Sequence, residues 1–183
     1  MRVKSKWSKK DKTHSVEEIG GALAFIAWRI GQNILLSMEN NDYQTDTQLQ
    51  RLNIIEELLA FTIHIIDRMT IERFSDEDRQ RFMTELVMKT AKHMEDNKRD
   101  IIGPGEYKQS YIDLVNQRMN DYADFNYDEE SGGPSFPMRR FFGDRVAVQM
   151  GEKNRKWVAD QMIEVEAPEI LDALKKAVPN LFM

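Results

Sequence analysis

Apolar residues cover most of the circumference of a helix over the stretch of residues 49–69. At 3.6 residues per turn they form a broad face with further apolar positions beside it. The face comprises Leu52, Ile55, Leu59, Thr62, Ile66 and Met69, flanked by Leu58, Ile63 and Ile65. Because other elements must cover so much apolar surface, this helix is expected at the centre of the fold.

A capping box marks the start of the preceding helix. Ser15 followed by Glu18 predicts a helix from residue 16 to about residue 40. Small residues recur along one of its sides at spacings of four, three and four: Gly20, Ala24, Ala27 and Gly31. Glycine inside a helix costs on the order of 1 kcal/mol relative to alanine, and close packing against another helix would offset that cost. The stripe therefore predicts either a helix crossing within the chain or the seam of a homodimer.

Two more helices follow the central one, which we predict over residues 47 to about 73. Ser75 is the expected N-cap of the next helix. Its predicted inward residues are Phe82, Met83, Leu86, Val87, Ala91 and Met94. The Gly-Pro-Gly sequence at 103–105 ends that helix, and another is predicted from about 106 to 125.

The C-terminal third begins with a long acidic loop rich in glycine, serine and proline, residues 126–137. A loop of this length is either a solvated connector or a cover over a site. Ser135 before Pro137 predicts a helix that reaches Met150, a further helix carries Trp157, and Pro168 predicts a final short helix that ends before Pro179. No alternating pattern typical of β-strands and no internal repeat is present.

These patterns predict an all-α protein, a single-domain irregular helical bundle of six to seven helices. The bundle helices occupy residues of about 16–125, and the C-terminal helices, 138–178, pack on the end of the bundle. Residues 14–183 form the domain, preceded by a flexible basic tail, residues 1–13. The first 12 residues carry a net charge of +5 in a chain whose total is −5, so the tail is a candidate contact for polyanions.

Composition excludes several kinds of chemistry. The chain has no cysteine, which excludes disulfides, thiolate catalysis and cysteine-ligated metals and is typical of a cytoplasmic protein. The basic N-terminus lacks the apolar region of a secretory signal. We expect no transmembrane segment, because Arg29, Gln32 and Asn33 interrupt the long apolar run of residues 19–36.

Sequence signatures of common enzymes are also missing. No Walker phosphate loop, dinucleotide-binding glycine motif, nucleophile elbow or zinc-protease motif occurs, and no cofactor or metal is indicated. The sequence therefore favours a non-enzymatic helical interaction or assembly protein, acting through a protein partner or through self-association. Eleven methionines would mostly fill the core, while any outside it would suit an adaptable apolar contact surface.

One polar stripe on the central helix is the strongest hint of chemistry. Glu57, His64, Asp67 and Arg68 lie in helical register on the side away from the broad apolar face. The stripe is either solvated or lines a pocket, where it could orient an acid–base pair or bind a hard metal through oxygen ligands. The second possibility makes the chain a ligand-pocket protein or an enzyme.

Arg118 falls among aromatic residues on the inward face of the predicted helix 106–125. Tyr111 and Tyr122 flank it, so its charge needs a buried partner, and Glu57 and Asp67 are the natural candidates. A structural ion pair is one interpretation. The other is an anion site formed by Arg118, Tyr111 and Tyr122.

Residues 144–162 partly resemble a helix-turn-helix. Gly151 stands at the turn, and the candidate recognition helix carries Lys153, Asn154, Arg155 and Lys156. Glu152 and Asp160 occupy positions where the motif prefers apolar residues, so the match is weak. A DNA-binding regulator is therefore a further alternative.

Overall fold

Helices account for 81% of the residues that the structure describes. The structure is a computed structural model that describes residues 13–128 and 132–183. In chain order its elements are α1 (Val16–Asn40), α2 (Gln48–Thr70), the 3-10 turn η2 (Ile71–Arg73), α3 (Asp76–Ile102), α4 (Lys108–Ala123), β1 (Tyr127–Asp128), β2 (Gly133–Pro134), α5 (Phe136–Met150), α6 (Arg155–Gln161), the π-helical turn η3 (Met162–Glu166) and α7 (Ala167–Leu181). The predicted all-α irregular bundle is confirmed.

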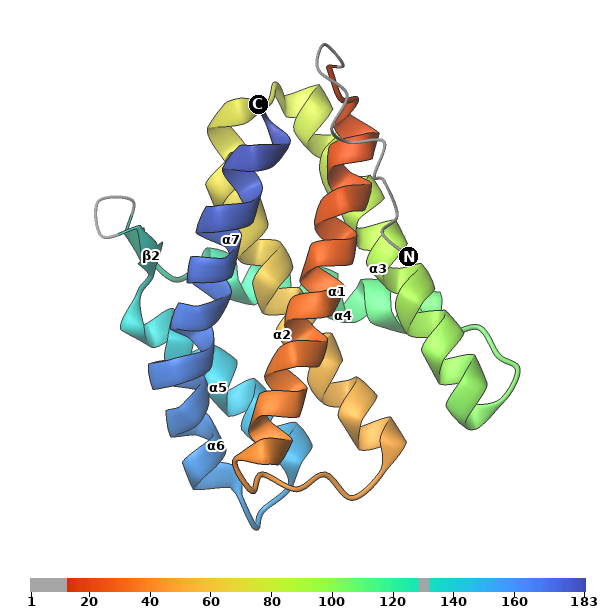
Figure 1. The fold of residues 1–183 in the computed structure, drawn as a ribbon, viewed down its shortest axis with the longest axis vertical. Helices are drawn as coiled ribbons and strands as arrows, with labels where there is room; N and C mark the ends of the chain where they lie inside the picture. The colour runs from red at the N-terminus through yellow and green to blue at the C-terminus, as the bar shows by residue number, and fades with distance from the viewer. Residues whose placement is uncertain (1–12, 129–131) are drawn as a thin grey trace, which may run out of the picture.

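Helix α2 lies at the centre of the arrangement, as its pattern predicts (Figure 1). Every residue from Ile54 to Asp67 is buried, because α1, α3, α4, α5 and α7 all pack against α2. The N-terminal helices therefore build the core around α2, and the C-terminal helices cover its remaining side.

Local capping sets most helix starts at the predicted residues. Ser15 and Glu18 form the expected capping box of α1, and Ser75 accepts a hydrogen bond from the amide of Asp78 at the start of α3. Ser135 caps α5 in the same way. The predicted end of the last helix is wrong, since α7 continues through Pro179 to Leu181.

The small-residue stripe of α1 is used inside the chain. A Cβ added at Gly20 would lie 3.0 Å from the carbonyl oxygen of Phe82 in α3, and one at Gly31 would lie 3.7 Å from the Ile55 side chain in α2. Ala24 and Ala27 between them are fully buried. The homodimer seam predicted through Gly20, Ala24, Ala27 and Gly31 is therefore wrong, because neighbouring helices of the same chain already cover these residues.

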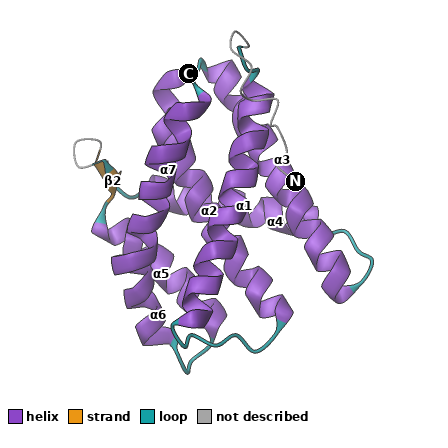
Figure 2. Ribbon diagram, in the orientation of Figure 1, coloured by secondary structure: helices purple, strands orange, loops and turns teal. Residues whose placement is uncertain are grey.

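A short hairpin interrupts the loop predicted over residues 126–137. Tyr127 pairs with Pro134, and Asp128 pairs with Gly133, in an antiparallel ladder (Figure 2). Strands of two residues are too short to produce an alternating pattern, which is why the sequence did not indicate them.

Two expectations concern the N-terminal part of the chain. The predicted basic tail lies outside the described residues, except for Thr13. Helix α1 is long and apolar enough to cross a membrane, but half of its most apolar window is buried within the protein. A single helix of this kind among the described residues is weak evidence for a membrane span, because core helices of soluble proteins and signal sequences have the same length and composition.

Candidate functional site

Three of the four residues of the polar stripe of α2 are buried, and the fourth, Arg68, is partly buried. The exposed fraction is 1% for Glu57 and 4% for both His64 and Asp67. The interpretation of these positions as a solvated stripe is therefore wrong. Buried polar groups need partners, and the partners of these residues show what the stripe does.

Arg118 and Glu57 form a buried bidentate ion pair. The Arg118 Nε and Nη2 atoms donate to the two carboxylate oxygens of Glu57, both at 2.8 Å, and Nη1 donates to Asp121 at 3.1 Å. The hydrogen bonds to Glu57 raise the pKa of the Arg118 guanidinium. The predicted ion pair is confirmed, and because two carboxylates neutralise Arg118, the geometry does not favour an anion site there.

His64 lies among aromatic rings. Its ring centroid is 5.3 Å from that of Tyr122, and neither of its nitrogens has a hydrogen-bond partner among the described residues. Burial lowers the His64 pKa to about 4, with a smaller contribution from Arg68 and against the attraction of Asp67. Burial likewise raises the pKa of the Tyr111 and Tyr122 phenols. At neutral pH His64 is therefore an uncharged core residue, with no carboxylate in place to form an acid–base pair.

Asp67 and Arg68 contact residues of other elements. The carboxylate of Asp67 accepts two hydrogen bonds from Arg79 of α3, both at 2.7 Å. The Arg68 guanidinium lies 5.5 Å from the ring centroid of Tyr127. The four residues of the stripe therefore make four separate contacts: Glu57 with Arg118, His64 with Tyr122, Asp67 with Arg79 and Arg68 with Tyr127. The structure does not bring them together as one catalytic or metal-binding group.

Sequence patterns did not indicate two polar contacts that position α3 and α4. Lys98 of α3 pairs with Glu56 of α2 at 2.5 Å, and both side chains are buried. Burial raises the Glu56 pKa despite this pairing. Glu95 of α3 accepts hydrogen bonds from the backbone amides of Tyr107 and Lys108, at 2.9 and 3.2 Å. These bonds lower the Glu95 pKa and give α4 the N-terminal cap that its own sequence lacks.

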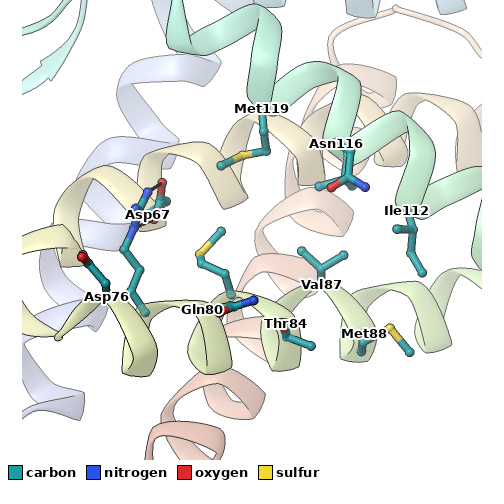
Figure 3. Close-up of a pocket in the computed structure, with 12 residues that line it drawn as sticks. Asp67, Asp76, Gln80, Thr84, Val87, Met88, Ile112, Asn116 and Met119 are labelled. Atoms are coloured by element: carbon teal, nitrogen blue, oxygen red, sulfur yellow. Dashed lines mark hydrogen bonds and ion pairs between the residues drawn. The ribbon is translucent and has the colours of Figure 1, made fainter.

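A groove of about 540 Å³ lies between α3 and α4. Side chains from both helices point into it, and Asp67 of α2 reaches one end (Figure 3). Six of the lining residues are apolar: Met83, Val87, Met88, Ile112, Val115 and Met119. Its polar lining comprises Asp67, Asp76, Arg79, Gln80, Thr84 and Asn116. We take this groove as the candidate functional site.

The groove exposes part of the α3 face that the sequence predicts to be inward. Phe82, Leu86 and Met94 of that face are buried as expected. Met83 and Val87 are only partly buried and line the groove instead. The spacing of apolar residues predicts the side of α3 on which Met83 and Val87 lie. It cannot predict that α4 leaves these two side chains only partly buried.

The two ends of the groove differ in polarity. Figure 3 shows Asp67 and Asp76 at one end and Met88 and Ile112 at the other. The charged lining consists of two carboxylates and one guanidinium, a net charge of −1. Both strong hydrogen bonds of Arg79 go to Asp67, and Asp76 is exposed at the polar end.

The basic residues proposed for DNA contact lie around the start of α6. Lys153, Arg155 and Lys156 are exposed, and Asn154 is partly buried at the start of α6. Arg155 and Lys156 share a hollow with Arg140 and with the acids Asp144, Glu152 and Asp160. Three carboxylates beside three cations weaken the attraction to phosphate. The charge distribution therefore gives the DNA hypothesis no added support.

The described residues contain no group of three or more histidine, aspartate or glutamate side chains placed to hold a metal ion. Comparison of the chain with protein-family models, with curated proteins and with solved structures found no match.

Proposed function

We propose that the protein is a non-enzymatic interaction protein that binds an amphipathic helix of a partner protein in the groove between α3 and α4. The observation that carries the proposal is the methionine-lined apolar floor, where Met83, Val87, Ile112 and Met119 are only partly buried. Met88, in its lining, is 43% exposed. An amphipathic helix placed there would bury its apolar face and keep its polar face in water.

The dimensions of the groove fit a helix. Its lining on α3 runs from Asp76 to Met88, which corresponds to about 18 Å along the helix axis at 1.5 Å per residue. That length equals about three turns of a partner helix, enough for apolar anchors at positions i, i+3 or i+4, and i+7.

The open shape favours a helix over a small molecule. Sites for small ligands are concave enough to bury most of the ligand surface. Here the walls carry the exposed residues Gln80, Thr84 and Asn116, so an occupant keeps one side in solvent. These polar groups could donate and accept hydrogen bonds along the edges of a bound helix.

Three of the lining residues are methionines: Met83, Met88 and Met119. The unbranched thioether side chain adapts to different apolar shapes, and methionine-rich surfaces therefore suit the binding of helices. The Glu57–Arg118 ion pair, the Asp67–Arg79 pair and the uncharged His64 are separate structural contacts, which removes the main support for the enzyme alternative.

A neutral probe peptide tests the proposal. The peptide has 16 residues, with leucines at positions 5, 8 and 12 and alanine and glutamine elsewhere, so that it forms one apolar stripe. Methyl-labelled methionine NMR should show that the signals of Met83, Met88 and Met119 shift on titration. The signals of the fully buried Met38 and Met138 serve as references and should stay in place.

A matched pair of variants locates the binding. Val87→Glu places a carboxylate in the groove and should weaken peptide binding at least about ten-fold, because that charge would be buried without a partner. Val148→Glu makes the same change at an exposed position of α5 and should leave binding unchanged. If Val87→Glu is unstable, Thr84→Arg blocks the groove from an exposed position.

Three outcomes would overturn the proposal. The peptide could fail to bind, it could bind both valine variants equally, or a long-chain alkyl sulfate could shift the groove methyls while the peptide does not. The last result would assign the groove to small apolar ligands.

A further inference from the structure

The polarity of the groove carries an inference about the partner, which rests on the proposed function. We infer that the partner helix bears a lysine or arginine that lies beside Asp76 when its apolar face fills the groove. The groove would therefore select its partner by charge as well as by apolar contact.

The acidic end provides the first support. Asp76 is exposed and lines the groove. Glu77 follows it in the first turn of α3, and the next acid, Asp78, pairs with Arg81 at 3.1 Å. A carboxylate in this position attracts a cation and repels an acidic partner.

The neighbouring Arg79 attracts Asp76 electrostatically, but its strong hydrogen bonds go to another acid. Arg79 Nε and Nη2 both donate to Asp67, at 2.7 Å each, and the Asp67 side chain is only 5% exposed. This bidentate pair holds the guanidinium against α2 and neutralises the buried acid. The lining keeps a net charge of −1, so a partner cation can bind Asp76 without breaking the hydrogen bonds between Arg79 and Asp67.

Geometry fixes where the cation belongs in the partner sequence. Met88 and Ile112 close the apolar end, about 18 Å from Asp76 along α3. An apolar anchor at that end and a cation at the acidic end are therefore about three turns apart in the partner helix. The expected pattern is one basic residue with apolar residues about four, seven and eleven positions away on the same face.

Three peptides with the same leucine stripe test the inference. They carry lysine, glutamine or glutamate at positions 1 and 16, so that one flanking residue meets Asp76 in either binding orientation. At low salt the lysine peptide should bind about three- to ten-fold more tightly than the glutamine peptide, and the glutamate peptide should bind more weakly than both. The differences should shrink as salt rises.

Charge reversal at Asp76 separates a local contact from the overall acidity of the protein. Asp76→Lys should reverse the order of the three peptides, and Asp76→Asn should abolish the difference between lysine and glutamine. Asp172→Lys changes the total charge by the same amount at an exposed position of α7 and should keep the original order.

The outcomes distinguish this inference from the proposed function. If all three peptides bind the groove equally, or if Asp172→Lys changes their order as Asp76→Lys does, the charge selection is wrong and the groove function stands. If the glutamine peptide does not bind at all and the lysine peptide does not shift the groove methyls, the proposed function itself fails.

Discussion

Removing Arg118 should destabilise the protein more than removing any partly exposed cation. The Arg118 and Glu57 side chains are 8% and 1% exposed, and Arg118→Ala would leave the Glu57 carboxylate buried without its two hydrogen bonds. Breaking a buried pair from one side typically costs about 3 to 5 kcal/mol. Because a domain has a total stability of about 5 to 15 kcal/mol, this loss is a large fraction of it.

Urea unfolding followed by circular dichroism measures the loss. With a denaturant slope of about 2 kcal/mol per molar, the midpoint should fall by about 1.5 to 2.5 M. Arg51 pairs with Glu39 at 2.9 Å, and the two side chains are 35% and 22% exposed. Arg51→Ala is the control, and its loss should stay below about 1 kcal/mol because water screens this pair.

A double-mutant cycle separates the ion pair from the packing of the Arg118 side chain. Glu57→Gln combined with Arg118→Ala should be less destabilised than the sum of the two single changes, because the double variant has no unpaired buried charge. A loss below about 1 kcal/mol for Arg118→Ala, or additive single effects, would refute the reasoning.

Two further predictions concern stability. Gly20 and Gly21 are adjacent in α1, but a Cβ at Gly20 would meet the Phe82 carbonyl oxygen at 3.0 Å, while a Cβ at Gly21 would meet nothing within 4 Å. Gly21→Ala should therefore stabilise the protein by roughly 0.5 to 1 kcal/mol, and Gly20→Ala should destabilise it. Thermal melts of the two variants measure both effects. Equal effects at the two positions would contradict the close helix contact. Burial lowers the pKa of His64 in the folded protein to about 4, against about 6.5 in the unfolded chain. The contribution of neutral His64 to stability is therefore fully present above a pH of about 6.5. About 3 kcal/mol of stability should be lost as the pH falls from about 6.5 to 4. His64→Leu should remove that part of the pH dependence, and an unchanged pH profile of unfolding would show that His64 is not its source.

Local signals explain why the helix starts could be predicted. Ser15, Ser75 and Ser135 each satisfy amide groups within three residues of themselves, so no information from distant parts of the chain is needed. The pairing of Arg118 could also be predicted, because a guanidinium on an apolar face must find an acid. Even there the sequence allowed either Glu57 or Asp67, and only the packing of the helices shows that Asp67 pairs with Arg79.

Burial of the α2 stripe could not be predicted in the same way. A polar stripe on one helix has the same pattern whether it faces water or the partners that neutralise it. Glu57 and Asp67 are buried because Arg118 reaches Glu57 from α4, 61 residues away in the chain, and Arg79 reaches Asp67 from the next helix, α3. The sequence contains these residues, but only the crossing of the helices shows which of them meet.

The position of α4 also depends on polar contacts between helices. Polar contacts fix α4 at two points: Glu95 of α3 caps its start, and Glu57 of α2 holds Arg118 near its middle. Apolar burial alone would favour closing α4 over Met83 and Val87, since each buried methylene contributes about 0.8 kcal/mol. Because charged hydrogen bonds require their own distances and directions, the two contacts keep α4 where those apolar residues stay open. With α4 held by these two contacts, Met83 and Val87 stay only partly buried and line the groove.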